Sequence, residues 1–477
     1  MTLHELLSLV SASDRPSLRT DSRMVKPGDI FIAVKGTVCD GHNFIEQAIA
    51  AGAKYIVCRQ PFHWQGVETV IVDDSAEIAG ILAQAAKGNP ASRLINLAVT
   101  GTNGKTTIAF LVRSVVQAAG SKCGLIGTII YDTVERSIEA PLTTPDCLII
   151  AEKQAEMVKA GAKYMVIEAS SHALSQNRLA GVNFKAAAFT NLTGDHLDYH
   201  KTPRQYLVAK TKLFEGLSKD AAAVLNRQSP QSAEIAEKTA AKILWYAVDG
   251  PADIIGRIES MDITGTVFIL EYAGQKIKIK TPLLGHYNVS NHLAAAGLCL
   301  VAGFDLKTVT AGLSALRAIP GRLERVDWNG DFTVLVDFAH TDDALKNVLT
   351  TLRPLCKGKL MVVFGCGGDR DKTKRPRMAK VAEQLADLVV VTSDNPRTER
   401  PEDIIKQIVA GLENLSSDKI TVEPDRRKAI ELALARAVKN DIVIIAGKGH
   451  ETYQIIGKQK FDFSDKDIAL RCLLKRK

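Results

Sequence analysis

The sequence predicts an α/β protein built from three domains. Short apolar runs of strand length alternate with amphipathic helical stretches along most of the chain, as in sheets whose strands are connected by helices. The length of 477 residues suits about three domains of ordinary size. We expect domains at residues 1–92, 93–318 and 319–477, because a glycine-rich loop opens the second segment and strand–helix alternation starts again in the third.

The first segment predicts a small α/β domain, because short strands alternate with helices. Its unusual feature is a set of polar residues near the strand ends, Asp21–Arg23 and Lys35–Thr37. Such residues can grip a small molecule, but the same residue types form ordinary turns, and both interpretations stay open. The expected strands are 31–34, 55–58 and 69–72, and the expected helices are 43–51 and 76–86.

The second segment opens with a glycine-rich turn, Gly101–Thr107, between an apolar strand at 94–99 and a helical pattern at 108–119. Glycines at such a turn let successive backbone N–H groups point at one phosphate group. Lys105 can then reach the outer phosphates, and the hydroxyl of Thr106 can bind Mg²⁺. The usual phosphate loop has four residues between its first glycine and Gly-Lys, whereas this sequence has two.

Polar residues follow the later strands of the second segment. Because ligands bind at the carboxyl ends of strands in open α/β sheets, we expect these residues to converge on the phosphate loop. Thr106, Glu168 and His196 could hold Mg²⁺, although histidine is unusual for a cation that prefers oxygen. The strands are expected at 124–130, 164–167 and 186–190, followed by Thr143–Pro145, Glu168–His172 and Asn191–His196.

The rest of the second segment predicts further helices and a different kind of strand pairing. Period-two alternation over 266–279 predicts antiparallel strands, and 285–303 predicts a helix with a polar start. Lys210 and Lys212 lie on a predicted helix at 204–217, where lysines are normally exposed to solvent.

The third segment predicts a second doubly wound sheet with polar strand ends. Two arginines at neighbouring strand ends, Arg370 and Arg397, suit a carboxylate, which they can bind with paired hydrogen bonds. Surface salt bridging is the alternative, because Asp369 and Asp371 flank Arg370. A Gly-x-Gly-x-x-Gly motif is absent, which gives no support for a dinucleotide site. The expected strands are 333–336, 360–364, 388–392 and 442–446.

The composition is compatible with a protein that binds anionic small molecules. The net charge of +8 is spread along the chain, which suits anionic ligands or simply a solvated surface, and no aromatic-interleaved basic patch indicates nucleic acid. The eight cysteines lack metal-binding spacing, no export signal is recognisable, and no apolar run has the length of a membrane span. We therefore expect a cytoplasmic monomer with reduced cysteines and no membrane span.

Taken in order, these motifs resemble the Mur ligases over nearly the whole chain. The shorter glycine loop of that family accounts for the spacing of the phosphate loop. The resemblance implies a small N-terminal α/β domain for the uridine end of a substrate, a central P-loop-type mononucleotide-binding sheet, and a C-terminal Rossmann-like doubly wound domain for an amino acid. The motifs are Thr100–Thr107, Thr143–Asp146, Glu168–His172, Asn191–His200, Gly321–Glu324, Asp337–Thr341, Gly367–Arg370 and Asp394–Arg397.

The resemblance also implies an activity. A ligase of this kind would use ATP and Mg²⁺ to add meso-diaminopimelate to UDP-N-acetylmuramoyl-L-alanyl-D-glutamate through an acyl phosphate, releasing ADP and phosphate in peptidoglycan precursor synthesis. A lysine-adding relative and a folylpolyglutamate synthetase are near alternatives, opposed by Arg397 and by the uridine-side motifs respectively. A nucleotide switch is an alternative of another class, but the guanine-reading Asn-Lys-x-Asp motif is absent at a suitable strand end.

The resemblance assigns expected roles to residues of all three domains. The ATP site would comprise Gly101, Thr102, Asn103, Gly104, Lys105, Thr106, Thr107, Asn288, Asn291, Arg322, Asp337 and His340. The UDP-substrate site would comprise Thr20, Ser22, Thr37, Thr143, Thr144, Ser170, Gln176 and Arg178, with Leu142 where a polar residue is common. The diaminopimelate pocket would comprise Arg370, Asp394, Asn395, Pro396, Arg397, Gly447 and Glu451. The metal ligands would be Thr106, Glu168, His196 and Lys210 as a carbamate, and the catalytic residues Lys105, Glu168, His196 and Lys210.

Overall fold

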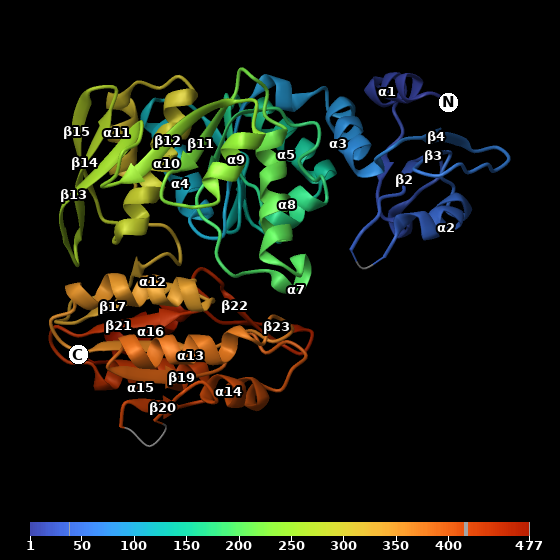
Figure 1. Cartoon of the computed structure of the whole chain (residues 1–477). Helices are drawn as coiled ribbons and strands as arrows, with labels where there is room; N and C mark the ends of the chain where they lie inside the picture. Colours follow the sequence, from blue (N-terminus) through green and yellow to red (C-terminus); the bar gives the residue numbers. More distant parts are fainter. Residues whose placement is uncertain (38, 415–417, 477) are drawn as a thin grey trace.

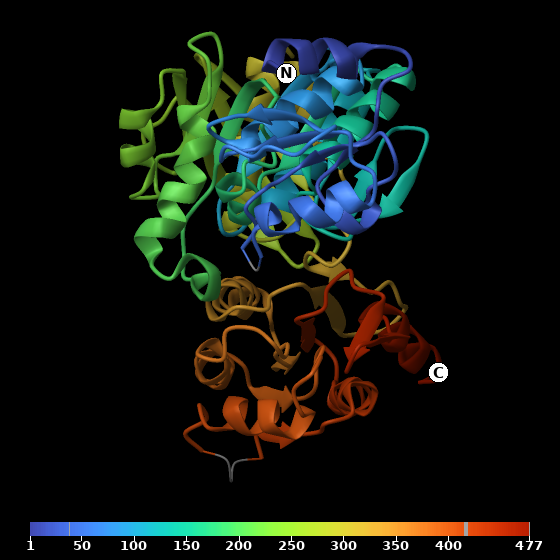
Figure 2. The same ribbon diagram turned by 90° about the vertical axis from the view of Figure 1, so that its right-hand side faces the viewer.

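The computed structural model describes residues 1–37, 39–414 and 418–476, and it contains three main β-sheets in three bodies (Figure 1). The N-terminal body lies beside the central body, and the C-terminal body lies below it. The view turned by 90° shows the same separation between the upper and lower bodies (Figure 2). The α/β fold class with three domains is therefore confirmed, while the boundaries at residues 92 and 318 stay predictions.

The N-terminal body is a parallel four-stranded sheet in the order β1-β2-β3-β4. Asp74 caps its last helix by accepting hydrogen bonds from the backbone N–H groups of Ala76 and Glu77. That helix joins the central body through the amide of Gln84, whose Nε2 donates to Oε1 of Gln154 at 2.6 Å. The elements are α1 (Leu3–Ser11), β1 (Leu18–Arg19), β2 (Ile30–Ile32), α2 (Ile45–Ala50), β3 (Tyr55–Cys58), β4 (Glu68–Ile71) and α3 (Ser75–Ala86), with short 3₁₀ turns at Ser22–Met24 and Gly41–Phe44.

The central body is an eleven-stranded sheet with β5 (Ile95–Thr100) between β10 (Phe184–Phe189) and β9 (Tyr164–Glu168), all parallel. A single strand at 124–130 was the wrong prediction, because the chain forms two antiparallel strands, β6 (Cys123–Ile126) and β7 (Ile130–Asp132). The turn between them brings the N–H of Thr128 to Glu168. A Cβ at Gly127 would lie 2.3 Å from Oε1 of Glu168, so a larger residue there would displace that carboxylate.

Two helical layers cover the central sheet. One face packs against α4 (Lys105–Ala118), α10 (His286–Val301) and α11 (Leu306–Ala315), and the other against α5 (Cys147–Lys159) and α8 (Pro203–Glu215). The predicted antiparallel addition over 266–279 is confirmed as β14 (Gly265–Tyr272) and β15 (Gln275–Thr281), and β13 (Ile254–Asp262), which was not predicted, pairs antiparallel with β14. The remaining elements are a 3₁₀ turn at Pro90–Arg93, β8 (Ser137–Glu139), α6 (Ser171–Ser175), α7 (Leu197–His200), β11 (Ala222–Asn226), α9 (Ser232–Lys238) and β12 (Lys242–Val248).

The C-terminal body is a six-stranded sheet in the order β16-β17-β21-β18-β19-β20, with helices on both faces, as a doubly wound sheet requires. One face carries α12 (Asp342–Leu352), α13 (Lys374–Leu385) and α14 (Pro401–Val409), and the other carries α15 (Arg426–Arg436) and α16 (Asp465–Leu474). The strands are β16 (Glu324–Arg325), β17 (Thr333–Asp337), β18 (Leu360–Phe364), β19 (Leu388–Val391), β20 (Ile420–Val422) and β21 (Ile442–Ala446), followed by the hairpin β22 (Tyr453–Ile456) and β23 (Gln459–Asp462), with a 3₁₀ turn at Arg353–Leu355.

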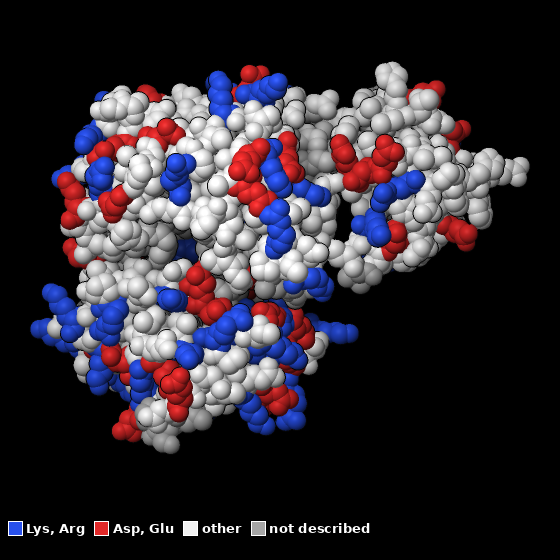
Figure 3. All heavy atoms as spheres, in the orientation of Figure 1, with Lys and Arg blue, Asp and Glu red and all other residues white. Residues whose placement is uncertain are grey.

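The surface carries both signs of charge. Figure 3 shows lysine and arginine side chains mixed with acidic ones over the visible face of the molecule, which matches the dispersed charge of the sequence. All eight cysteines are free thiols. Within the described ranges, no helix combines the length and the apolar character needed to cross a bilayer.

Candidate active site

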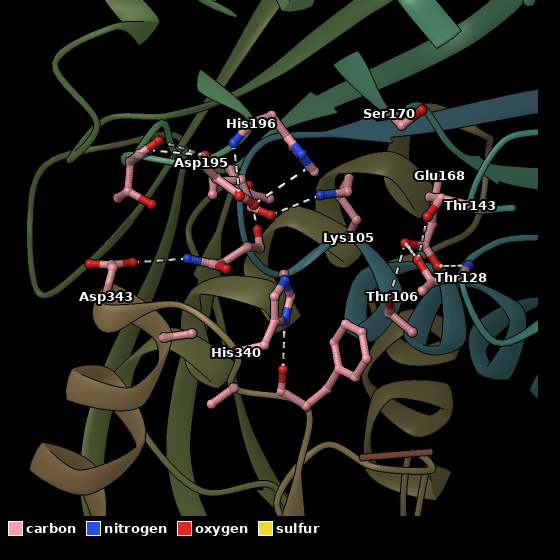
Figure 4. A pocket seen from close by; sticks show the side chains of 18 of the residues that line it. Lys105, Thr106, Thr128, Thr143, Glu168, Ser170, Asp195, His196, His340 and Asp343 are labelled. Carbon is pink, nitrogen blue, oxygen red and sulfur yellow. Dashed lines mark hydrogen bonds and ion pairs between the residues drawn. The ribbon is translucent and has the colours of Figure 1, made fainter. Parts of the chain in front are cut away.

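A cavity of about 760 Å³ lies between the central and C-terminal bodies. Most of the expected site residues from both bodies line it, although they come from distant parts of the chain (Figure 4). The expected residues on its wall are Thr102–Thr107, Thr143, Thr144, Glu168, Ser170, Arg178, His196, Lys210, Asn288, Asn291, Arg322, Asp337, His340, Arg370, Asp394, Asn395, Arg397, Gly447 and Glu451.

The phosphate loop connects the end of β5 to the start of α4, as the sequence predicts. Gly104 has a φ of +93°, and a Cβ there would lie 2.3 Å from Oδ1 of Asn291. The Nζ of Lys105 donates to the carbonyl oxygens of Gly101 and Thr102, at 2.8 Å each. The N-terminus of α4 opens onto the cavity, which is the geometry of an anion site.

Glu168 is a fully buried carboxylate at the end of β9. It accepts hydrogen bonds from the backbone N–H of Thr128 at 2.8 Å, from the hydroxyl of Thr128 at 2.9 Å and from the hydroxyl of Thr106 at 3.0 Å (Figure 4). Nη2 of Arg322, from the C-terminal side, also donates to the Thr106 hydroxyl at 3.2 Å. This set of hydroxyl and carboxylate oxygens fits the ligand preference of Mg²⁺.

Lys210 corrects an expectation drawn from its residue type. Its side chain is 1% exposed, whereas the sequence pattern predicts solvent exposure, and only Lys212 is exposed. The helix α8 buries Tyr206 one turn earlier, and Nζ of Lys210 lies 4.3 Å from the centre of the Tyr206 ring. The same Nζ donates to the Gly101 carbonyl at 2.8 Å. Burial and the charge of Lys105 hold the pKa of Lys210 well below its usual range.

His196 lies at the wall of the cavity in a left-handed backbone conformation, with a φ of +55°. Its Nε2 is 3.5 Å from Oδ2 of Asp195, and its ring meets the ring of His172 edge-on. Among the residues that the structure describes, no three His, Cys, Asp or Glu side chains are grouped so that they could hold a metal ion. The oxygen pair of Thr106 and Glu168 is thus the part of the expected metal site that fits best, and the role of His196 stays a prediction.

The C-terminal wall around the half-buried Arg322 and His340 is polar. The carboxylate of Asp337 accepts from the N–H groups of Leu323 and Ala339, and burial raises its pKa. Burial also lowers the pKa of His340 to about 4.

Asparagine side chains near the phosphate loop form two hydrogen bonds, one within α10 and one from the loop to α12. On α10, Nδ2 of Asn291 donates to Oδ1 of Asn288 at 3.1 Å. Across the cavity, Nδ2 of Asn103 donates to Oδ2 of Asp343 at 2.9 Å, which ties the loop directly to α12 of the C-terminal body (Figure 4).

The end of the cavity that is expected to hold an amino acid combines two arginines with two acidic groups. Nη1 of Arg397 donates to the carbonyl of Gly368 at 2.8 Å, and its backbone has a φ of +52°. Among the described residues Arg370 forms no ion pair, and its neighbour Asp371 lies 4.0 Å from Arg377 instead, so the carboxylate-binding role of Arg370 stays a prediction. Burial alone would raise the pKa of Asp394, but the charges of Lys448 and Arg426 hold it below its usual range.

Glu451 is held in place by a fully buried lysine. Nζ of Lys448 donates to Oε2 of Glu451 at 2.8 Å and to Oδ1 of Asn395 at 3.1 Å. Because that Oδ1 also accepts from the N–H of Ile455, Nδ2 of Asn395 faces Glu451 and donates to it at 2.8 Å. These hydrogen bonds fix the orientation of the carboxylate.

The expected residues for the UDP-linked substrate fall into two groups. Thr143, Thr144, Ser170 and Arg178 line the cavity. Gln176 stands behind them and accepts two hydrogen bonds from the Arg178 guanidinium. Thr20, Ser22 and Thr37 lie in the N-terminal body and are not part of the cavity wall. Two residues expected for the other sites, Gly101 for ATP and Pro396 for diaminopimelate, also do not line the cavity. Leu142 is 53% exposed at its edge.

Several cavity residues escaped the sequence reasoning, among them Thr128, Tyr206, Asp343 and Lys374. Thr128 lies inside the segment predicted as one strand, and Tyr206 lies in a predicted helix whose pattern is typical of an ordinary core-facing helix. Asp343 and Lys374 stand in the first turns of amphipathic helices, where charged residues are common. Only the spacing of Tyr206 and Lys210, four residues apart on one helix face, carried a usable signal.

Comparison with known proteins gives the family of the chain. Family models match residues 17–96 (Mur ligase family, catalytic domain), 99–299 (Mur ligase middle domain) and 321–449 (Mur ligase, glutamate ligase domain). A protein of Geobacillus thermodenitrificans named UDP-N-acetylmuramoyl-L-alanyl-D-glutamate–2,6-diaminopimelate ligase is 43% identical over 470 residues, which cover 97% of this chain and 96% of that protein. The chain belongs to the Mur ligase family.

Other Mur ligases extend this similarity over the whole chain. A protein of the same name from Gloeobacter violaceus is 44% identical over 490 aligned positions, covering 100% of this chain and 99% of its own. A solved structure of a ligase with that name superimposes with a TM-score of 0.70 at 33% identity, covering 96% of this chain and 95% of the other. As a Mur ligase, the chain is an ADP-forming amide ligase that binds ATP.

Proposed function

We propose that this Mur ligase adds meso-diaminopimelate to UDP-N-acetylmuramoyl-L-alanyl-D-glutamate, with ATP as the energy source, in peptidoglycan precursor synthesis. The observation that carries the proposal is one cavity with the phosphate loop on one wall and Arg397 and Glu451 on the facing wall. A phosphoryl donor and an amino acid can therefore meet there. The names of relatives that match nearly the full chain support the choice of amino acid.

The phosphoryl-transfer end is built from the first turn of α4. Its N-terminus and Lys105 would hold the phosphates of ATP and neutralise their charge. Thr106 and Glu168, with His196 and Lys210, would hold Mg²⁺, which supplies positive charge between the triphosphate and a carboxylate. Asn288, Asn291, Arg322, Asp337 and His340 would surround the rest of the nucleotide.

The chemistry proceeds in two displacements. A γ-carboxylate oxygen of the substrate attacks the terminal phosphorus of ATP, and ADP leaves, which gives an acyl phosphate. The amine of diaminopimelate then attacks the carbonyl carbon, and the tetrahedral intermediate collapses to an amide as phosphate leaves and the amine loses a proton. The facing bodies would exclude water from the acyl phosphate, which water would hydrolyse.

Lys210 would act as a carbamate. A neutral amine reacts with CO₂, and the lowered pKa of Lys210 favours the neutral form. The product is an anionic oxygen ligand in place of a cation, which explains a buried lysine beside the phosphate loop.

The amino-acid pocket would select diaminopimelate by charge. Arg370 and Arg397 suit its carboxylate, and Asp394 and Glu451 suit an ammonium group. Lysine lacks the second carboxylate and would leave Arg397 desolvated without a partner, at a cost of about 1–3 kcal/mol.

The UDP-linked substrate would span two bodies. Thr20, Ser22 and Thr37 would bind its uridine end, and Thr143, Thr144, Ser170, Gln176 and Arg178 its diphosphate and sugar region. We further propose that the enzyme acts as a monomer in the cytoplasm, where ATP and the UDP-linked substrate are available.

A phosphate-release assay tests the proposal. With ATP and the UDP-linked muramyl dipeptide present, release should depend on diaminopimelate and remain at background with lysine. Release with lysine but not with diaminopimelate refutes the substrate. Nucleotide hydrolysis that no amino acid affects would favour a nucleotide switch instead.

A further inference from the structure

We propose that the buried Arg426–Asp465 ion pair is a positioning device that sets the width of the amino-acid pocket. The inference rests on the proposed function, because it concerns how the pocket for diaminopimelate is held in shape. Neither residue lines the cavity, so both would act through the loops they hold.

All three nitrogen atoms of the Arg426 guanidinium donate hydrogen bonds. Nε donates to Oδ1 of Asp465 at 2.8 Å, and Nη2 donates to Oδ2 at 2.7 Å, so the pair is bidentate. Both side chains are fully buried. The guanidinium also reaches two backbone carbonyls, with Nη1 at 3.2 Å from the oxygen of Ser393 and Nη2 at 3.0 Å from the oxygen of Ala446.

These carbonyls belong to strand ends that do not neighbour each other. In the sheet, β18 lies between β19 and β21, so no ladder hydrogen bond can fix the distance between the loops after β19 and β21. Ser393 directly precedes Asp394, and Ala446 directly precedes Gly447. One planar guanidinium therefore spans the end of β18 and joins the two loops that carry the pocket.

The pocket side chains depend on that distance. Nζ of Lys448, on the loop after β21, contacts Oδ1 of Asn395, on the loop after β19, at 3.1 Å. A Cβ at Gly447 would lie 2.7 Å from Oδ2 of Asp394, so the loops already touch. A shift of one loop would therefore move Asn395 and Glu451 apart and change the spacing between the acidic groups and Arg397.

Stability alone does not account for this pair. Burying two charges costs desolvation energy, and replacing a buried ion pair with apolar residues of similar size is often neutral or stabilising. The Arg353–Asp387 pair at the opposite end of the same sheet shows the contrast, because its side chains are 37% and 44% exposed. The buried pair stands at the end of the strands where ligands bind.

The test uses an apolar replacement of both partners, Arg426→Met with Asp465→Leu, and the single change Arg426→Lys. The double variant leaves no unpaired buried charge and should fold. The Arg426→Lys variant keeps the positive charge, but a single ammonium group cannot reach the carbonyl oxygens of both Ser393 and Ala446. Steady-state kinetics with ATP, the UDP-linked dipeptide and diaminopimelate give three KM values and kcat for each protein. Arg353→Met, which removes the exposed pair of the same sheet, is the matched control.

We expect the KM for diaminopimelate to rise about 10- to 100-fold in both variants, with the KM values for the other substrates within about twofold of the parent. The control should keep all three values. Unchanged KM for diaminopimelate in a folded double variant overturns the inference, and so does an equal rise for all substrates. If Arg426→Met with Asp465→Leu does not fold, Arg426→Lys decides by the same criterion. Failure of the proposed function is a separate result, because the parent protein itself would then release no phosphate with diaminopimelate.

Discussion

Replacing Arg397 with alanine should weaken the binding of diaminopimelate far more than the binding of ATP. In the structure the guanidinium lines the cavity, and its only described hydrogen bond goes to the carbonyl of Gly368, so its other N–H groups remain for a ligand carboxylate. A hydrogen bond to a charged partner contributes about 1.5–3 kcal/mol. The loss corresponds to a rise of about 10- to 150-fold in the KM for diaminopimelate.

The assay is amino-acid-dependent phosphate release, with each substrate varied while the others are saturating. Arg400→Ala is the matched control, because the Arg400 side chain is 78% exposed and, among the described residues, forms an ion pair only with Glu402, at 3.9 Å. Arg397→Lys keeps the charge but loses the planar fork, so its KM should lie between those of the parent and the alanine variant.

The selectivity of the variant provides a second readout. If Arg397 binds the carboxylate that lysine lacks, its removal should narrow the preference for diaminopimelate over lysine. An equal loss for ATP and for diaminopimelate would mean that Arg397 is misassigned. An unchanged preference between the two amino acids would mean that another group reads the carboxylate.

Three further predictions concern the phosphate loop, the buried lysine and a supporting ion pair. Lys105→Ala should lower ATP turnover at least about 100-fold while the UDP-linked substrate still binds by calorimetry, and unimpaired turnover would place the phosphates elsewhere. Lys210→Ala should abolish activity and recover part of it with added formate or acetate, whereas full activity without them contradicts the carbamate. The bidentate hydrogen bond to Arg375, with other contacts, holds the pKa of Glu399 at about 2. The ionised Glu399 therefore stabilises the folded state fully at pH values above the usual carboxyl pKa, and this stabilisation is lost as the pH falls through about 2. Glu399→Gln should therefore lower the free energy of unfolding by about 1–2 kcal/mol at pH 7, a figure that allows for partial solvent access, and by less at pH 3. A loss of stability that is the same at both pH values would refute this explanation.

The sequence was sufficient for the elements whose burial pattern is simple. Runs such as 360–364 and 442–446 are apolar at every position, so they predict central parallel strands, and the structure places β18 and β21 there. The pattern at 124–130 failed because a turn at Gly127 is set by a contact with Glu168, forty residues later, and no local signal reports it.

The site was predictable where chemistry follows a motif and unpredictable where it depends on packing. Lys105 and Thr106 could be placed from the glycine-rich turn alone, because a strand, a turn and a helix fix their surroundings. Lys210 could not, since periodicity does not distinguish a buried lysine from an exposed one, and its role rests on the family resemblance. Asp343 is held beside Asn103 by the approach of two separate bodies, which a pattern within one segment cannot show.

The carbonyl oxygen of Gly101 accepts a hydrogen bond from Lys105 and another from Lys210, both at 2.8 Å. Because the charge of Lys105 disfavours a second ammonium group at the same acceptor, protonating Lys210 in the folded protein works against a repulsion. Conversion of Lys210 into an anion would turn that repulsion into attraction. Dissolved CO₂ would then behave as a ligand of the folded state, and the melting temperature should climb with bicarbonate in the parent protein, before any nucleotide is added, and stay level in Lys210→Ala.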